Sequence, residues 1–335
     1  MTDYIIEKGK LPQNMKLYGV DENFYRMPKS VAETVSPNVL NMCNQPAGGR
    51  VRFKTNSTKI GIKAELIDSC INSGIDVLSN GIYCGKVRAD DEDNETYYEG
   101  MLSLTPSDDI KADSIKDITV FLPRIVHVSK IILSLDDGAV VLEPDPYLIE
   151  KPIVWYGSSI THGGSSNSPS KCYVALVSEM LGANHVNLGF GGSALAEKEM
   201  AEYIASLDMT AFIMDYEHNS PSVDYLRKTH KPFFDIIRKA QPDLPILMIS
   251  RPDVDREYMR CCTTRRIIMD TFHQALDNGD TKVDYVDGFY LWGNDNREEC
   301  TVDGCHPSEK GFQRMADTTY PRLKRLLARC GIKCK

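Results

Sequence analysis

A short hydroxyl-rich segment, GSSITH at residues 157–162, lies between an apolar run and a helical pattern. A serine in front of a helix is most often a cap or a turn former. It can also act as a nucleophile, if a base takes its proton and a third group orients that base. Whether this segment does chemistry therefore depends on which partners the rest of the chain supplies.

Asp303 and His306 have the residue types and the spacing of an orienting acid and a base. They stand three residues apart in a turn that precedes a helical pattern. The carboxylate can then hold one ring nitrogen while the other faces a serine. A histidine near a helix start can also be an ordinary polar residue. The position on the last loop before the C-terminal helix favours the catalytic interpretation.

Two further loops contain groups that could stabilise negative charge during acyl transfer. GFGGS at residues 189–193 offers backbone N–H donors, and DYEHN at residues 215–219 ends in Asn219. Taken alone, glycine-rich turns are common and can equally suit a phosphate, and an asparagine near a proline is an ordinary turn residue. Taken with the serine loop and the Asp/His pair, they predict acyl transfer.

The spacing of apolar residues predicts the elements that must hold these loops. Short apolar runs alternate with helical patterns in the C-terminal half, which is typical of a parallel sheet covered by helices. The expected strands are 152–157, 185–190, 210–216, 245–250 and 283–288, and the expected helices are 171–181, 196–207, 224–240, 257–276 and 308–330. We expect the third helix to be disturbed at Pro232. The candidate loops follow strands, where open parallel sheets gather reactive groups.

The N-terminal half has a different pattern. Residues 51–66 alternate at the period of two that half-buried strands need, and Asn80-Gly81 predicts a hairpin. No long helical pattern interrupts these strands, so we expect an antiparallel, jelly-roll-like β-sandwich. Prolines 144, 146 and 152 mark the boundary. The predicted domains are a sandwich over residues 1–148 and an α/β domain over residues 149–335.

Charge and hydropathy limit the classes of partner that we expect for this protein. The formal charge is −8 and no basic cluster stands out, which argues against nucleic-acid binding. No apolar run approaches the roughly 18 residues of a membrane span, so no membrane partner is expected. The N-terminus lacks the apolar segment of a secretory signal, which predicts a cytoplasmic protein.

The ten cysteines are irregularly spaced, which predicts reduced thiols. A zinc interpretation joins Cys300, Cys305 and His306 to a second pair, Cys330 and Cys334. Structural zinc sites usually show two close ligand pairs, and the second pair here lies at the end of the chain. Ordinary thiols are favoured, and we predict neither a metal nor a cofactor.

The loops described above resemble the blocks of the SGNH, or GDSL-type, hydrolase superfamily of esterases and acylhydrolases. The resemblance covers about residues 151–330. The family block Gly-Asp-Ser-Ile-Thr is similar to GSSIT at residues 157–161, which implies Ser159 as the nucleophile rather than Ser158. Ser158 stands where the family commonly has Asp, so any orienting role of that carboxylate is absent or reassigned.

The other blocks occur in the family's order. The block Asn-x-x-x-x-Gly is similar to NLGFGG and implies Gly192 as a backbone donor to an oxyanion. The block that ends in Asn is similar to DYEHN and implies Asn219, although its usual glycine and second Asp are missing. The block Asp-x-x-His matches Asp303 and His306. A subset with an N-terminal β-sandwich resembles much of the whole chain, and carbohydrate esterases share this architecture.

The resemblance implies a three-layer α/β/α, flavodoxin-like hydrolase domain and ester hydrolysis through an acyl-enzyme. His306, oriented by Asp303, would activate Ser159. The N–H groups of Ser159 and Gly192 and the amide of Asn219 would hold the oxyanion. The implied substrate is a small polar ester, most specifically an O-acetylated carbohydrate such as an imported oligosaccharide.

Several questions stay open at this point. Trp155, Tyr216, Trp292 and Tyr290 lie near the loops and could stack on sugar rings, although a core role is favoured for each. A thioesterase, a lysophospholipase-type lipase and a decayed carbohydrate-binding protein are the alternative functions. The sandwich could bind sugar, form a lid or mediate homo-oligomerisation.

Overall fold

The computed structural model describes residues 1–68, 74–89, 96–107 and 109–335. These residues divide into two compact units. The first comprises Met1–Pro28, Asn41–Pro146 and Asn167–Ser170, and the second comprises Lys29–Leu40, Tyr147–Ser166 and Lys171–Lys335. The predicted domain boundary between residues 148 and 149 stays a prediction.

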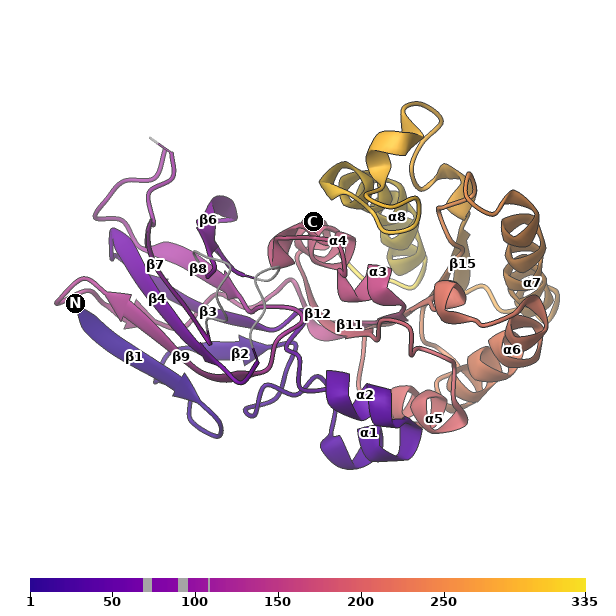
Figure 1. Ribbon diagram of the computed structural model, residues 1–335, viewed down its shortest axis with the longest axis horizontal. Coiled ribbons are helices and arrows are strands. Elements are labelled where there is room, and N and C mark those ends of the chain that lie inside the picture. Colours follow the sequence, from indigo (N-terminus) through magenta and orange to yellow (C-terminus); the bar gives the residue numbers. More distant parts are fainter. Residues whose placement is uncertain (69–73, 90–95, 108) are drawn as a thin grey trace. The chain divides into compact units, whose positions relative to one another are not determined.

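The first unit is built from antiparallel strands (Figure 1). One sheet pairs β1 (Thr2–Glu7), β9 (Val128–Leu135), β4 (Lys59–Leu66) and β7 (Tyr97–Ser103), in that order. The other pairs β10 (Val141–Leu142), β3 (Arg50–Thr55), β8 (Lys116–Phe121), β5 (Ile75–Ser79) and β6 (Ile82–Val87), with β2 (Lys16–Tyr18) also on β3. Ile60 and Ile62 of β4 share one core with Val51 and Phe53 of β3. The predicted antiparallel sandwich is therefore confirmed, and its jelly-roll connectivity stays a prediction.

Local details of this half differ in one respect from the sequence expectation. Asn80 and Gly81 both have positive φ, at 50° and 78°, and join β5 to β6 as the predicted hairpin. The chain also forms two short helices that the pattern did not indicate, α1 (Lys29–Val35) and α2 (Pro37–Met42). Each fully buries one residue, so neither has the repeated apolar spacing that would reveal it.

The second unit contains a parallel sheet of five strands. These are β11 (Ile149–Gly157), β12 (Ala183–Gly189), β13 (Ala211–Asp215), β14 (Ile246–Ile249) and β15 (Val283–Val286). They pair in the order β12-β11-β13-β14-β15. Counted from β11, this is the 2-1-3-4-5 order of flavodoxin-like sheets, which confirms the expected fold.

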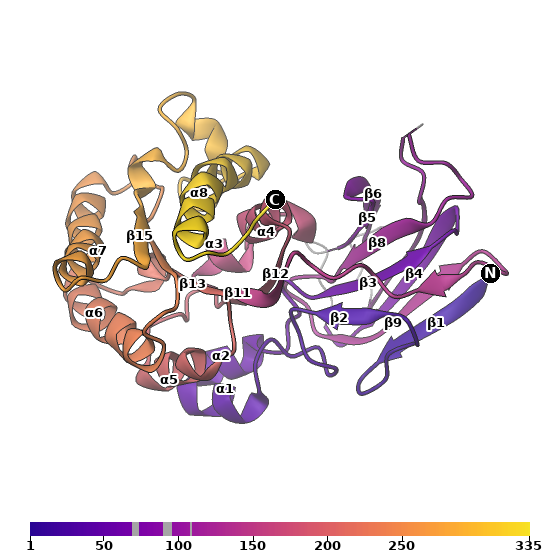
Figure 2. The same cartoon turned by 180° about the vertical axis from the view of Figure 1, so that it is seen from behind.

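Helices cover both faces of this sheet (Figure 2). They are α3 (Ser159–His162), α4 (Tyr173–Leu181), α5 (Lys198–Ser206), α6 (Val223–Ala240), α7 (Tyr258–Asp277) and α8 (Glu309–Arg329). Successive strand residues point to opposite faces. Accordingly, Trp155 meets Tyr173 of α4 edge-on at 5.3 Å, whereas Tyr156 stacks on Phe233 of α6 at 5.1 Å. Among the described helices, none combines the length and the apolar character needed to cross a bilayer.

Pro232 does not end its helix, and the predicted disturbance at this residue stays a prediction. Helix α6 continues through this residue from Val223 to Ala240. Phe233 and Phe234, which follow the proline, are both buried. Packing of this face holds the helix together, although the proline removes one backbone hydrogen bond.

Candidate active site

Three of the candidate loops leave neighbouring strands at the point where the strand order changes direction. Ser159 follows β11, Gly192 follows β12, and Asn219 follows β13. Strand β11 lies between the other two, so their carboxyl ends meet at one edge of the sheet. Ligand sites of open α/β sheets form at such a switch point.

The two adjacent serines have different surroundings. Ser158 is fully buried, and its hydroxyl accepts a hydrogen bond from the N–H of Ile160 at 3.2 Å. It is the N-cap of α3, the role that a serine before a helix most often has. Ser159 is the first residue of that helix and is partly exposed. Of the two serines, Ser159 is the one whose hydroxyl lies within hydrogen-bond distance of another predicted site residue, His306.

The structure brings Ser159, His306 and Asp303 together. The Ser159 Oγ lies 2.9 Å from Nε2 of His306. Nδ1 of the same ring lies 2.7 Å from Oδ2 of Asp303. With the ring proton on Nδ1 and donated to the carboxylate, Nε2 is free to accept the serine proton.

The turn that carries this pair is held by local hydrogen bonds. Oδ1 of Asp303 accepts from the N–H groups of Cys305 at 2.9 Å and His306 at 2.7 Å. Gly304 has a φ of +83°, a conformation that glycine adopts without strain. The hydroxyl of Ser165 donates to the carbonyl of Pro307 at 2.6 Å and so links the serine loop to this turn.

These hydrogen bonds also determine the charge state of Asp303. Partial burial raises the pKa of Asp303, but hydrogen bonds from the His306 ring and from the N–H groups of His306 and Cys305 outweigh it. Together they lower the pKa to about 2. Asp303 is therefore ionised at neutral pH and can stabilise a protonated imidazole.

The predicted oxyanion donors also lie together. Gly192 donates its N–H to Oδ1 of Asn219 at 3.2 Å, and Nδ2 of Asn219 donates to the carbonyl of Phe190 at 2.8 Å. That bond uses one of the two hydrogens of the amide, so the second is available for a substrate. Gly191 lies against Ser159, the predicted nucleophile, because a Cβ on Gly191 would come within 3.4 Å of Cβ of Ser159.

Replacing Asn219 by alanine tests its predicted role. We expect kcat to fall on the order of 10²- to 10³-fold with little change in KM, because the lost donor acts on charge that develops in the transition state. Steady-state kinetics on a short-chain aryl ester measures both constants. The exposed Asn278→Ala is the matched control. A change in KM alone would contradict the role.

Sequence reasoning missed the buried network beneath the serine. Asp215, at the end of β13, accepts hydrogen bonds from the hydroxyls of Tyr173 and of Thr161, the latter at 2.9 Å. Asn187 donates to the carbonyl of Thr161 at 2.8 Å. Asn187 lies on β12, Asp215 on β13 and Tyr173 on α4. Through Thr161, they hold helix α3, on which Ser159 also lies.

Two glycines in this region are required by close approach. A Cβ on Gly157 would come within 2.1 Å of Oγ1 of Thr161 and 2.4 Å of the carbonyl oxygen of Asp215. A Cβ on Gly189 would come within 2.2 Å of the backbone nitrogen of His162. The strand ends therefore pack directly against α3, which sets the position of Ser159.

The pH dependence of stability should reveal the buried carboxyl. Burial raises the pKa of Asp215 to about 6, although hydrogen bonds from Tyr173 and Thr161 and the charge of His218 oppose it. Unfolded aspartate has a pKa of about 3.9. The folded state thus binds the extra proton between about pH 4 and 6, so the contribution of Asp215 to stability falls as pH rises through this range.

The variant Asp215→Asn removes this pH-dependent contribution to the free energy of unfolding. Its free energy of unfolding, relative to the native chain, should rise by up to about 3 kcal/mol between pH 4 and pH 7.5. Urea unfolding at both pH values measures the difference, and the exposed Asp208→Asn is the matched control. A difference that is the same at both pH values would contradict the expectation.

Three of the four aromatic residues considered for sugar stacking are buried. Trp155, Tyr216 and Trp292 are each at most 1% exposed. Trp155 and Trp292 belong to the core between the sheet and helices α4 and α8. Because a stacking ring needs an open face, the structure assigns these three to the core rather than to a sugar. Tyr290 is 59% exposed.

A cavity lies next to Asp303, the predicted orienting acid. Its volume is about 630 Å³, and Asp303 and Gly304 form part of its wall. The other lining side chains include Arg256, Asn294, Asn296 and Glu298. Charged and amide groups of this kind can hydrogen-bond a ligand that carries hydroxyl groups.

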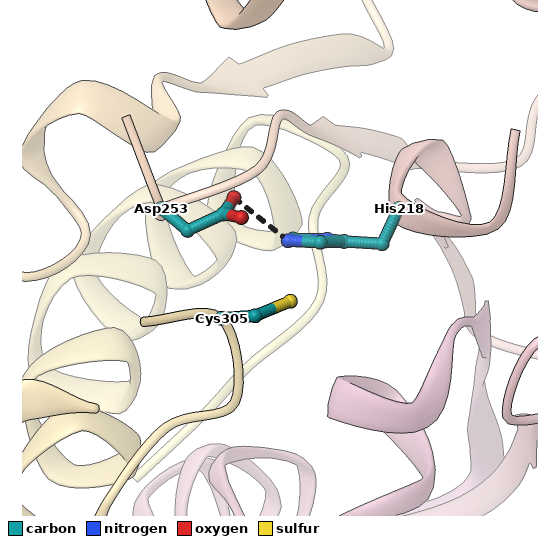
Figure 3. Close-up of side chains that lie close together, drawn as sticks. All are labelled: His218, Asp253 and Cys305. Atoms are coloured by element: carbon teal, nitrogen blue, oxygen red, sulfur yellow. Dashed lines mark hydrogen bonds and ion pairs between the residues drawn. The ribbon is translucent and has the colours of Figure 1, made fainter. Parts of the chain in front are cut away.

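The cysteines form no disulfide among the described residues. Nine are free thiols, and Cys70 lies outside the described residues. Cys300, considered above as a zinc ligand, is buried and lies 3.7 Å from the carbonyl of Trp292. A different trio, His218, Asp253 and Cys305, has donor atoms within 4.8 Å of one another (Figure 3).

Comparison with protein families finds a matching profile in each of two parts of the chain. The profile of the GDSL-like Lipase/Acylhydrolase family matches residues 150–324, more than half of the chain. The profile described as N-terminus of Esterase_SGNH_hydro-type matches residues 8–77. The comparison with curated proteins returns no match.

Solved structures share the fold over nearly the whole chain. A GDSL-like lipase from Bacteroides ovatus is 24% identical with a TM-score of 0.83, covering 100% of this chain and 99% of that one. The salicylyl-acyltransferase SsfX3 from a tetracycline biosynthetic pathway is 19% identical with a TM-score of 0.75, covering 97% of each. The acetyl xylan esterase Est2A from the rumen bacterium Butyrivibrio proteoclasticus is 16% identical with a TM-score of 0.62, covering 98% and 99%. With its matching family profile and its SGNH-type fold, the chain belongs to the GDSL-like lipase/acylhydrolase family.

Proposed function

We propose that this protein is a serine esterase that removes acetyl groups from carbohydrates. The observation that carries the proposal is the relay from Ser159 through His306 to Asp303, with bonds of 2.9 and 2.7 Å. A nucleophile, a base and an orienting acid in this geometry are the requirements for acyl transfer through a covalent intermediate.

In the proposed reaction, Oγ of Ser159 attacks the ester carbonyl while its proton moves to Nε2 of His306. The N–H groups of Ser159 and Gly192 and the amide of Asn219 stabilise the oxyanion, for which the Gly192 N–H turns from Oδ1 of Asn219 to the substrate. The bond to the sugar oxygen then breaks, and His306 returns the proton to that oxygen. Water, activated by the same histidine, releases acetate and restores the serine.

Two observations support a carbohydrate ester. The acetyl xylan esterase Est2A matches almost the whole chain, so a sugar-directed enzyme can use this architecture. The cavity beside Asp303 is lined by charged and amide side chains, which can hydrogen-bond sugar hydroxyls. Because the buried tryptophans cannot stack on a sugar, we expect recognition to depend on these polar groups.

A substrate panel tests the proposal. Acetylated xylo- and manno-oligosaccharides, acyl-thioesters and lysophospholipids are compared by kcat/KM, with acetate release and acyl transfer to added alcohols measured separately. We expect the acetylated oligosaccharides to be preferred, with free acetate as the product. Preference for longer acyl chains would overturn the sugar assignment. Failure of the native chain to react with a fluorophosphonate would indicate an inactive site.

A further inference from the structure

A thiol and a histidine lie close together in the structure, and each is the sequence neighbour of a candidate catalytic residue. Cys305 directly precedes His306, and His218 directly precedes Asn219. A ring nitrogen of His218, a carboxylate oxygen of Asp253 and Sγ of Cys305 all lie within 4.8 Å of one another. Figure 3 shows the sulfur pointing toward the space beside the His218 ring. The proposed reaction uses none of these three side chains.

Two cationic side chains, His218 and Arg251, lie near the thiol together with carboxylates. Asp253 is fully buried, and its Oδ1 lies 2.7 Å from Nε of Arg251 and 2.9 Å from Nε2 of His218. Burial lowers the pKa of His218, but the hydrogen bond and the charge of Asp253 outweigh it and raise the pKa to about 9. At neutral pH this group therefore holds two cations and the Asp253 carboxylate. The carboxylates of Glu257, 3.4 Å from Arg251, and of Asp303, which accepts from the N–H of Cys305, also lie close by.

One polar atom of the cluster has no partner. The side chain of His218 is 6% exposed, and its Nδ1 makes no hydrogen bond within the described part of the chain. A buried N–H donor of this kind is costly unless something accepts from it. Cys305 is partly exposed and is a free thiol.

We propose that Cys305 is a modification site for small disulfides, with His218 as its activating neighbour. Reactive cysteines are partly exposed and lie next to a cationic side chain, and Cys305 has His218 as that neighbour. The thiolate sulfur attacks one sulfur of the disulfide, a new S–S bond forms to Cys305, and the second half leaves as a thiolate. The sulfur proton passes to solvent, and a reducing thiol reverses the exchange.

The effect on catalysis rests on the proposed function and follows from the position of Cys305. Its backbone N–H holds Oδ1 of Asp303 at 2.9 Å, and the next residue is His306. A mixed disulfide adds bulk beside His218 and displaces this turn from Ser159. A metal cation is less suited to the cluster, because Arg251 and His218 already bind the carboxylate and repel a further positive charge.

Oxidised glutathione tests the proposal on the full chain. The adduct on each cysteine is followed by peptide mass mapping, and ester turnover is measured in parallel. We expect Cys305 to react before the other partly exposed cysteines of the described chain, with turnover falling as the adduct forms and returning with dithiothreitol. The adduct is detected by mass spectrometry and does not depend on catalysis. Absence of esterase activity would therefore contradict the proposed function without contradicting the modification of Cys305.

Three variants separate the causes. Cys305→Ser should make turnover insensitive to oxidised glutathione, whereas Cys262→Ser, the matched control, should remain sensitive. His218→Gln should slow the adduct on the order of tenfold, because it removes the cation beside the thiol. If this variant does not fold, peptide mass mapping of the native chain still tests whether Cys305 reacts first. An adduct that forms first on another cysteine overturns the proposal, as does Zn²⁺ binding that requires Cys305 and His218 while the thiol resists the disulfide.

Discussion

The Ser159→Ala variant is expected to lose turnover on the order of 10⁶-fold, with no residual covalent labelling by a fluorophosphonate. The Oγ that it removes is the atom 2.9 Å from Nε2 of His306, and no acyl-enzyme can form without it. What remains is the contribution of substrate binding and of the oxyanion donors. Turnover of a short-chain aryl ester by native and variant chains, with mass spectrometry of the labelled protein, provides the measurement.

The neighbouring serine is the matched control. Ser158→Ala removes the cap of α3 and should cost about 1 kcal/mol in the free energy of unfolding. It should retain both turnover and labelling, because Ser158 is buried and its hydroxyl faces the helix backbone. A label on Ser158, or turnover that survives only in Ser159→Ala, would show that the wrong serine has been assigned.

Asp303→Asn should lower kcat on the order of 10⁴-fold while substrate binding changes little. An amide in this position can donate to Nδ1 of His306, which places the ring proton on Nε2 and blocks proton transfer from Ser159. Steady-state kinetics on the substrate panel tests this result. Because acid and base are coupled, Asp303→Asn combined with Ser159→Ala should be no slower than Ser159→Ala alone. Additive losses would contradict a shared role.

The same carboxylate predicts the behaviour in acid. Hydrogen bonds lower the pKa of Asp303 to about 2 against partial burial, whereas unfolded aspartate has a pKa of about 3.9. Its contribution to stability is therefore complete above about pH 4 and is lost as pH falls toward about 2. Thermal unfolding of native and Asp303→Asn chains should converge in this range. A difference that stays constant from pH 5 to pH 2 would refute the expectation.

Local patterns were sufficient for most elements of the fold. Alternation at residues 51–66 predicted β3 and β4, and the Asn80-Gly81 pair predicted a hairpin, because both depend on neighbouring residues. The parallel sheet followed from repeated apolar runs. Helices α1 and α2 were missed because each buries too few residues to show a period, and α6 crosses Pro232 because its packed face outweighs one lost hydrogen bond.

The sequence by itself determined which groups could react. The turn from Asp303 to His306 is local, so its spacing alone predicted a carboxylate held against an imidazole. The choice of Ser159 over Ser158 came from the family resemblance, and their different burial agrees with that choice. Chemistry that depends on residues close in the chain can be predicted from their types and spacing.

Only the tertiary structure decided what surrounds those groups. It placed Asp215, Thr161 and Tyr173 in one buried network, and it brought His218 to Cys305 across almost ninety residues of chain. Sequence spacing carries no signal for such contacts, because they arise when separate strands and helices pack together. The same packing buried Trp155, which sequence proximity to the serine loop had suggested for sugar binding.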